Sequence, residues 1–202
     1  MKISTIEVDG EIALGVAVEG GFALATGWTG GERDLVHALA TDTLSELAPL
    51  TSAKADVSFE EVRFLPPVPA PGKIICVGVN YDAHREEMGR VKVGYPTLFV
   101  RWPSSVVGHR QPILRPKVSE RFDYEGELAV IIGRRGREAP AAEALSLVAG
   151  YACFNDGSVR DYQRHSSQFT PGKNFEASGG FGPWMGCRCP TTLEGHRTKR
   201  VG

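Results

Sequence analysis

The chain has 202 residues, enough for one medium domain or for one domain with a small additional unit. Hydrophobic residues make up 42% of it, and at this length a core can form without disulfides. A formal net charge of −1 gives no electrostatic reason to expect nucleic acid or an anionic membrane surface as a partner. No apolar run is long enough to cross a bilayer, and the first residues lack the apolar core of a signal peptide. We therefore expect a cytoplasmic protein with no nucleic-acid or membrane partner.

The first part of the chain, residues 1–64, has the pattern of a small α/β domain. Asp9-Gly10 is a dipeptide typical of a tight hairpin turn, and it separates two stretches of alternating polarity. Leucines at roughly helical spacing then predict a helix that is broken near Thr41. The expected elements are strands at 2–8, 12–18 and 22–25 and a helix over 32–50.

Prolines divide the chain after this domain. Four prolines between Pro66 and Pro71 exclude both a helix interior and a central strand, so we expect an extended linker over 65–72. A functional unit is expected over 73–185, and the basic, cysteine-bearing segment 186–202 is expected to add little core. Within the functional unit the patterns predict strands at 73–79, 97–101, 125–132 and 151–154 and a helix over 141–148.

The most informative stretch is Asp123-Tyr-Glu125-Gly-Glu127. On a strand these three acids share one face, where their mutual repulsion favours a counter-ion such as a divalent cation. The alternative is a solvated acidic face that pairs loosely with Arg121 or Arg101. The apolar run that follows the acids predicts a core strand, so the acids are expected at the mouth of a buried strand.

Three weaker candidates have ordinary structural explanations as well. His84 and Glu87 share one face of a helix and suit a general base, although such pairs are commonly surface contacts. Asp156 lies in a polar turn after an apolar strand, where function tends to collect, but taken alone it is better explained as a helix cap or turn former. Lys173 lies in a Gly/Pro loop, where it is either a solvated lysine or a partner for an anionic substrate.

Taken in order, five segments between Lys73 and Met185 resemble the fumarylacetoacetate hydrolase family. They are Lys73-Ile-Ile-Cys-Val-Gly-Val-Asn-Tyr-Asp-Ala-His84-Arg-Glu-Glu87, Asp123-Tyr-Glu125-Gly-Glu127-Leu, Gly150-Tyr-Ala-Cys-Phe-Asn-Asp156-Gly-Ser-Val-Arg160-Asp-Tyr-Gln163, Gly172-Lys173-Asn-Phe and Gly182-Pro-Trp.

The resemblance implies a β-rich α+β fold. A mixed β-roll catalytic domain, incomplete in this chain, would follow the small α/β domain, and a homodimer is the expected assembly. The implied metal is Mg²⁺, with Mn²⁺ or Ca²⁺ as substitutes. Its implied ligands are Glu125, Glu127 and Asp156.

The resemblance also implies the residues that act on the substrate. His84 and Glu87 would form the dyad that activates water, and Lys173 would stabilise developing negative charge. Gln163 and Arg101 would contact the substrate, Arg101 standing where the family usually carries lysine.

The implied function is metal-dependent chemistry, as a hydrolase or lyase, on small 2-oxo or 1,3-dioxo acids. Acylpyruvate-type C–C bond hydrolysis is the first expectation. The alternative is a decarboxylase, hydratase or isomerase of 2-oxo-dioic acids in aromatic catabolism.

The sequence departs from the family after Met185. Family members continue well past the Gly-Pro-Trp segment, whereas here both the family pattern and the apolar content stop. We therefore expect a coding sequence truncated by a frameshift near residue 186, which adds an inactive family member to the alternatives. An intact reading frame at the locus would contradict the truncation.

Overall fold

The structure is a computed structural model that describes residues 1–26, 34–81, 86, 89 and 94–187. It confirms the expected fold class, because short strands outnumber short helices throughout the described residues. These residues form two compact units, each built from separate stretches of the chain. The first unit contains residues 1–68, 128–153 and 182–187, and the second contains 69–127 and 154–181.

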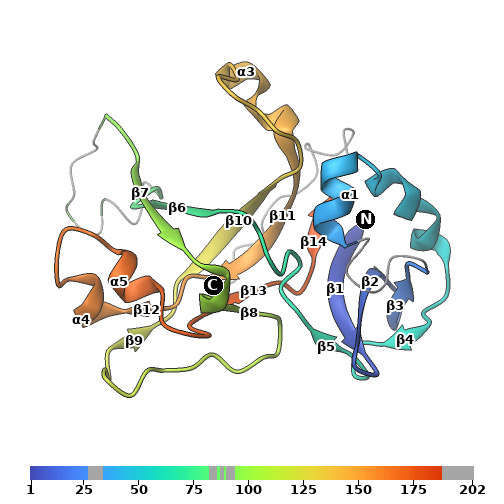
Figure 1. The fold of residues 1–202 in the computed structure, drawn as a ribbon, viewed down its shortest axis with the longest axis horizontal. Coiled ribbons are helices and arrows are strands. Elements are labelled where there is room, and N and C mark those ends of the chain that lie inside the picture. Colours follow the sequence, from blue (N-terminus) through green and yellow to red (C-terminus); the bar gives the residue numbers. More distant parts are fainter. Residues whose placement is uncertain (27–33, 82–85, 87–88, 90–93, 188–202) are drawn as a thin grey trace. The chain divides into compact units, whose positions relative to one another are not determined.

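A sheet dominates the first unit, and Figure 1 shows its first three strands side by side. Its strand order is β4-β3-β2-β1-β14-β11, with β5 paired to β1 and β10 paired to β11. The strands are β1 (Lys2–Val8), β2 (Glu11–Val18), β3 (Gly21–Leu24), β4 (Val57–Ser58), β5 (Arg63–Phe64), β14 (Met185–Cys187) and the parts of β10 (Gly126–Ile132) and β11 (Val148–Asn155) that fall in this unit.

The hairpin predicted at the N-terminus is confirmed. Strands β1 and β2 pair antiparallel, with Val8 opposite Glu11 across the turn. Both turn residues have positive φ, 51° at Asp9 and 84° at Gly10, as a two-residue turn of the favoured hairpin type requires. The turn residues therefore fix the register that buries one face of the hairpin.

The core of the first unit is aromatic. Phe22 is fully buried and meets the ring of Phe59 edge-on at 5.0 Å and the ring of Phe64 at 5.7 Å. Ile6 and Ala13, from β1 and β2, complete the buried cluster.

The helices are short, and the predicted break near Thr41 is confirmed. Helix α1 (Leu35–Thr41) starts at Asp34, whose carboxylate accepts a hydrogen bond from the His37 N–H at 2.8 Å. The helix predicted over 141–148 forms only in part, because β11 begins at Val148. The remaining helical segments of this unit are the 3₁₀-helices η1 (Leu44–Ser52) and η3 (Leu145–Leu147) and helix α3 (Ala141–Ala144).

No helix in the described ranges is long and apolar enough to span a membrane.

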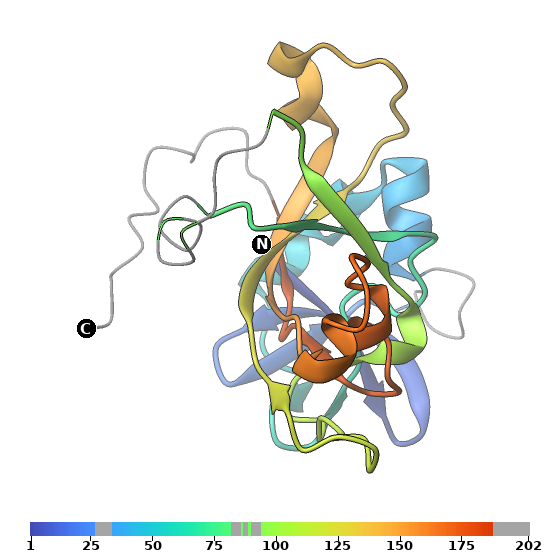
Figure 2. The same cartoon turned by 90° about the vertical axis from the view of Figure 1, so that its left-hand side faces the viewer.

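The second unit is built from small pairings of strands. Strand β6 pairs antiparallel with β7, β9 with β12, and β13 lies between β8 and the last residues of β11. Helix α5 lies beside β7, and both can be followed in Figure 2. The elements are β6 (Ile74–Gly78), β7 (Thr97–Arg101), η2 (Pro103–Ser105), β8 (Val106–Val107), β9 (Phe122–Asp123), β12 (Ser158–Val159), α4 (Arg160–Gln163), α5 (Thr170–Lys173) and β13 (Gly179–Phe181).

The strand predicted at 73–79 forms as β6, but one face of the β6–β7 pair is exposed, although its apolar run is typical of a buried strand. Ile75 pairs with Val100, and Val77 pairs with Leu98. Their exposed fractions range from 40% at Val100 to 59% at Ile75. We call these four residues the outer face. The alternate residues, including buried Phe99, point to the opposite side.

Strand β10 departs from its prediction in the same way. Leu128, Val130 and Ile132 are each about half exposed, whereas Ile131 is buried. An unbroken apolar run predicts burial on both faces, but here the described residues cover only one.

Candidate functional site

The two acidic segments of the second unit are held together by their backbones. The Asp156 N–H donates to the Glu125 carbonyl oxygen at 2.9 Å, and the Glu125 N–H donates to the Asn155 side chain at 3.1 Å. Beside them, β9 pairs with β12, with Asp123 opposite Ser158. The main chain thus places Asp123, Glu125 and Asp156 in one neighbourhood.

Asp156 lies between two buried cations. Its side chain is 5% exposed, and its two oxygens accept from different donors. Arg101 Nη1 donates to Oδ1 at 2.6 Å, and Lys173 Nζ donates to Oδ2 at 2.6 Å. A buried carboxylate is stable only when paired in this way.

Glu125 shares the same lysine. Its Oε2 accepts from Lys173 Nζ at 2.8 Å, and its Oε1 accepts from Arg160 Nη1 and from Ser158 Oγ. Burial raises the pKa of the Glu125 carboxyl, but the Lys173 ammonium and the Arg160 guanidinium outweigh burial and hold that pKa below its ordinary value. Glu125 is therefore a carboxylate at neutral pH.

Lys173 reaches both acids because helix α5 approaches helix α4 closely. A Cβ at Gly172 would lie 2.5 Å from the Gln163 backbone nitrogen, so a larger residue there would push α5 away. The Lys173 side chain is 1% exposed, and its Nζ lies 5.2 Å from the centre of the Phe99 ring.

Glu127 lies close enough to Glu125 and Asp156 for their charges to act on its carboxyl group. Burial raises its pKa, a hydrogen bond from Tyr81 lowers it, and the charges of Glu125 and Asp156 raise it further. Within the described residues, no three His, Cys, Asp or Glu side chains converge as metal ligands do. The oxygen donors suit a hard cation chemically, but in this structure a lysine ammonium lies between two of them.

Arg101 makes five hydrogen bonds to protein acceptors, which uses every N–H of its guanidinium. Its side chain is 0% exposed. The partners are Ser105 (Oγ and O), Asp156, the Gly157 carbonyl and Ser178 Oγ. The substrate contact expected of Arg101 stays a prediction, and in this structure its side chain ties β7 to the Asp156 segment.

Arg160 is a site residue to which the sequence reasoning gave no role. Its Nε and Nη2 both donate to Asp123 Oδ2, and its Nη1 donates to Gln163 Oε1 at 3.1 Å as well as to Glu125. The side chain stays 26% exposed, at the edge of the charge cluster. Its position one turn before Gln163 and four residues after Asp156 was the available signal.

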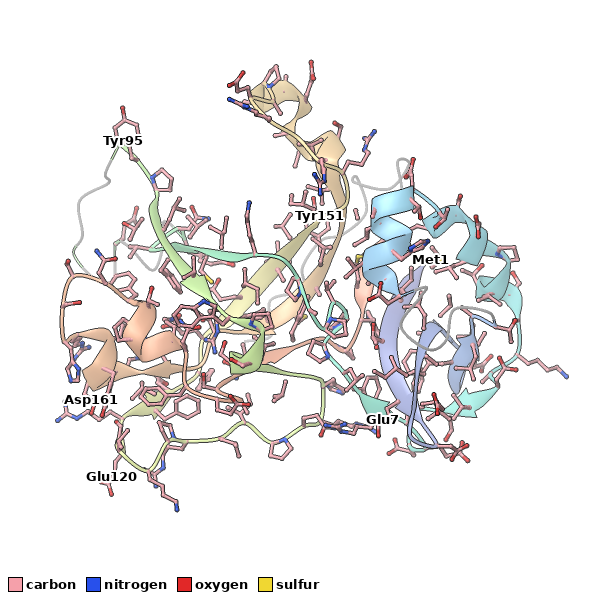
Figure 3. All side chains as sticks on the ribbon, viewed as in Figure 1. Met1, Glu7, Tyr95, Glu120, Tyr151 and Asp161 are labelled. Atoms are coloured by element: carbon pink, nitrogen blue, oxygen red, sulfur yellow. The ribbon has the colours of Figure 1, made fainter. Side chains whose placement is uncertain are left out.

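Helix α4, which carries Arg160 and Gln163, is also held by a hydrogen bond from the loop before β9. Asp161, labelled on α4 in Figure 3, accepts a hydrogen bond from Ser119 Oγ at 2.7 Å. Tyr95, at the far end of the same unit in that view, is 87% exposed and takes no part in the cluster.

Of the residues predicted from the sequence, the site brings together Asp156, Glu125, Lys173, Arg101 and Gln163. His84 and Glu87 lie outside the described residues.

The fold is shared with hydrolases and isomerases of known structure. The fumarylacetoacetate hydrolase from Exiguobacterium antarcticum matches with a TM-score of 0.75 and 34% identity, covering 93% of this chain and 66% of that one. The 5-carboxymethyl-2-hydroxymuconate delta-isomerase from Mycobacterium smegmatis matches with a TM-score of 0.70 and 28% identity, covering 94% of this chain and 67% of that one.

The sequence comparison identifies the family. The model of the fumarylacetoacetate (FAA) hydrolase C-terminal domain matches residues 73–195. The chain belongs to the fumarylacetoacetate hydrolase family.

Two relatives show the range of the similarity. An uncharacterized protein from Archaeoglobus fulgidus is 42% identical over 130 residues, which cover 64% of this chain and 52% of the relative. The mitochondrial oxaloacetate tautomerase FAHD2A from Homo sapiens is 39% identical over 125 residues, which cover 61% of this chain and 40% of the relative. The chain thus matches about half, or less, of the length of these curated relatives.

Proposed function

We propose that the second unit contains the catalytic centre of a metal-dependent enzyme that acts on small 2-oxo or 1,3-dioxo acids. The observation that carries this proposal is the pair of carboxylates, Asp156 and Glu125, on either side of one buried ammonium. Such a cluster holds fixed charges out of water, where they act strongly on a charged substrate. Membership of a family whose named relatives are hydrolases, isomerases and tautomerases supports it.

The proposed metal ligands are Glu125, Asp156 and Glu127. When bound, Mg²⁺, Mn²⁺ or Ca²⁺ would polarise the carbonyl oxygens of the substrate. Burial is the main cause of the raised pKa of Glu127, and the charges of Glu125 and Asp156 add to it, which supports a place for Glu127 beside these two acids.

Two side chains are proposed to act on the substrate directly. Lys173 would stabilise negative charge that develops on an oxygen of the substrate. Gln163 would donate from its amide NH₂ group, because its Oε1 already accepts from Arg160. Its partner would then be a hydrogen-bond acceptor, such as a carboxylate or keto oxygen.

The first candidate reaction is C–C bond hydrolysis of an acylpyruvate. Water adds to the acyl carbonyl, the C–C bond breaks, and the electron pair stays with the pyruvate half as an enolate that takes up a proton. His84 and Glu87 are proposed to accept the proton from the water.

The second candidate is the tautomerisation or isomerisation of a 2-oxo acid. The names of two matched relatives, an oxaloacetate tautomerase and a muconate delta-isomerase, favour it. It uses the same stabilised enolate, but it moves a proton between atoms of the substrate and breaks no C–C bond.

Two parallel assays test the proposal and separate the two reactions. The purified chain is mixed with Mn²⁺ and acetylpyruvate, with the release of pyruvate followed, or with Mn²⁺ and enol-oxaloacetate, with the absorbance of the enol followed. We expect turnover of one substrate that EDTA abolishes, and Glu125→Gln should lower the rate at least about 100-fold, since even outer-shell changes at metal sites cost 10- to 100-fold.

The matched control is Glu120→Gln, a change of the same kind at an exposed loop position. It should leave the rate unchanged. A chain that turns over neither substrate with Mn²⁺, or that is equally active with EDTA, contradicts the proposal.

A further inference from the structure

The Lys173 ammonium lies where two of the proposed metal ligands meet. Its Nζ is 2.6 Å from Asp156 Oδ2 and 2.8 Å from Glu125 Oε2, and the side chain is 1% exposed. One buried cation therefore bridges the two carboxylates from the separate acidic segments.

The other oxygens of these carboxylates are also engaged. Asp156 Oδ1 accepts from buried Arg101, and Glu125 Oε1 accepts from Arg160 and Ser158. No oxygen of either acid faces the site without a donor. A second cation that binds between them would therefore meet the Lys173 ammonium and compete with it for Asp156 Oδ2 and Glu125 Oε2.

Lys173 has little to turn to once it leaves the acids. Its remaining described contacts are the Asp156 carbonyl oxygen, at 3.5 Å, and the Phe99 ring, at 5.2 Å. Neither carries a full negative charge. The carboxylates of Glu127 and Asp123 also interact with Lys173, but Glu127 is itself a proposed metal ligand and Asp123 already accepts from Arg160. A buried ammonium without a direct counter-charge is costly. The carboxylate of a bound oxo acid would supply the missing charge.

We infer that Lys173 competes with the divalent cation for Asp156 and Glu125, so that the metal and an anionic oxo acid bind cooperatively through this lysine. The inference rests on the proposed function, because it takes those two acids as metal ligands. Metal alone binds weakly, since it leaves the ammonium unpaired. Metal with an oxo acid binds well, since the substrate carboxylate takes over the ammonium.

Mn²⁺ titrations of the whole chain by calorimetry, with and without oxalate, test the inference. Oxalate is a chelating dianion that is not turned over. Without oxalate, Lys173→Gln should bind Mn²⁺ at least about tenfold more tightly than the wild type, because no ammonium competes. For each protein, the ratio of the Mn²⁺ dissociation constants without and with oxalate measures how much oxalate strengthens Mn²⁺ binding. This ratio should be at least about tenfold larger for the wild type than for the variant.

The comparison of the two ratios is the decisive measurement. Oxalate also chelates the metal directly, and this contribution is present in both proteins and cancels when the ratios are compared. Lys117→Gln, at an exposed position, is the matched control and should behave as the wild type.

The Mn²⁺ titrations separate a failure of the inference from a failure of the proposed function. Wild type that binds Mn²⁺ while Lys173→Gln binds it equally or more weakly overturns the inference and leaves the proposed function standing. A chain that binds no Mn²⁺ in either form, with or without oxalate, contradicts both.

A measurement on the wild type covers the case in which Lys173→Gln does not fold. Acetic anhydride labels accessible amines, and mass spectrometry reports the labelling of each lysine. Mn²⁺ alone should raise the labelling of Lys173, and oxalate added with Mn²⁺ should lower it again. Labelling of Lys173 that does not respond to Mn²⁺, in a chain that binds it, overturns the inference.

Discussion

At the scale of single residues, the site is a set of buried charges that depend on one another. The sequence indicated which acids matter, because their alternation and turn context are local properties. It could not indicate how cations are shared among them. Arg101 reaches Asp156 across 55 positions of the chain, and Lys173 reaches Glu125 across 48. Contacts at such separations are set by packing rather than by spacing.

The structure predicts that Arg101 is needed for stability. Arg101→Met leaves Asp156 with a single counter-ion and removes the donors to the Gly157 carbonyl and Ser178. The free energy of unfolding should fall by about 3–5 kcal/mol, the usual cost of breaking a buried pair. Urea denaturation measures this directly.

Arg137 offers a control for the same chemical change. Its side chain is 90% exposed and, among the described residues, it pairs with exposed Glu138. Arg137→Met should change the free energy of unfolding by less than about 0.5 kcal/mol. If Arg101→Met proves as stable as the wild type, the guanidinium is not a structural bridge and the substrate contact regains support.

At the scale of elements, the sequence patterns found the described strands of four or more residues but misjudged their surroundings. The predicted strand at 97–101 coincides with β7, and the N-terminal hairpin forms around its expected turn, because both signals are local. Burial depends on what packs against each face, so the apolar runs of β6 and β10 suggested cores that the described residues do not complete. The two-residue strands β4, β5, β8, β9 and β12 are too short to leave a pattern.

Neighbouring residues of strand β7 are expected to differ in how much they contribute to the free energy of unfolding. Phe99 is 8% exposed and packs on Phe169 at 5.8 Å, so Phe99→Ala should cost about 3–5 kcal/mol of unfolding free energy. Leu98, on the outer face, is 57% exposed, so Leu98→Ala should cost less than about 1 kcal/mol. Urea denaturation of both variants checks the order. Equal losses would mean that the outer face is covered in solution.

At the scale of the whole molecule, each unit is assembled from distant parts of the chain. Residues 128–153 fall in one unit, between two stretches of the other, so neither unit is a continuous domain in sequence. Periodicity and composition describe neighbouring residues, and they gave no signal for this interleaving. The homodimer and the cytoplasmic location remain predictions.

Apolar surface on the described residues predicts that the isolated chain binds a hydrophobic dye. Val77 and its neighbours on the outer face, and β10 in the other unit, expose aliphatic side chains in rows. The folded chain should therefore enhance the fluorescence of ANS, and Val77→Lys should lower the enhancement. Val118→Lys makes the same change at a loop valine that is 63% exposed, and it should have a smaller effect. Identical signals from both variants would contradict a dye site on the outer face.

The hydrogen bond between the Asp156 N–H and the Glu125 carbonyl has a consequence for how such a site diversifies. It joins main-chain atoms, so the spacing of the two segments does not depend on which side chains they carry. Substitutions at these positions can alter the reactive groups while the distance between them persists. A scaffold whose geometry is set by main-chain atoms can carry different catalytic side chains. This is consistent with the matched relatives, whose names describe different reactions.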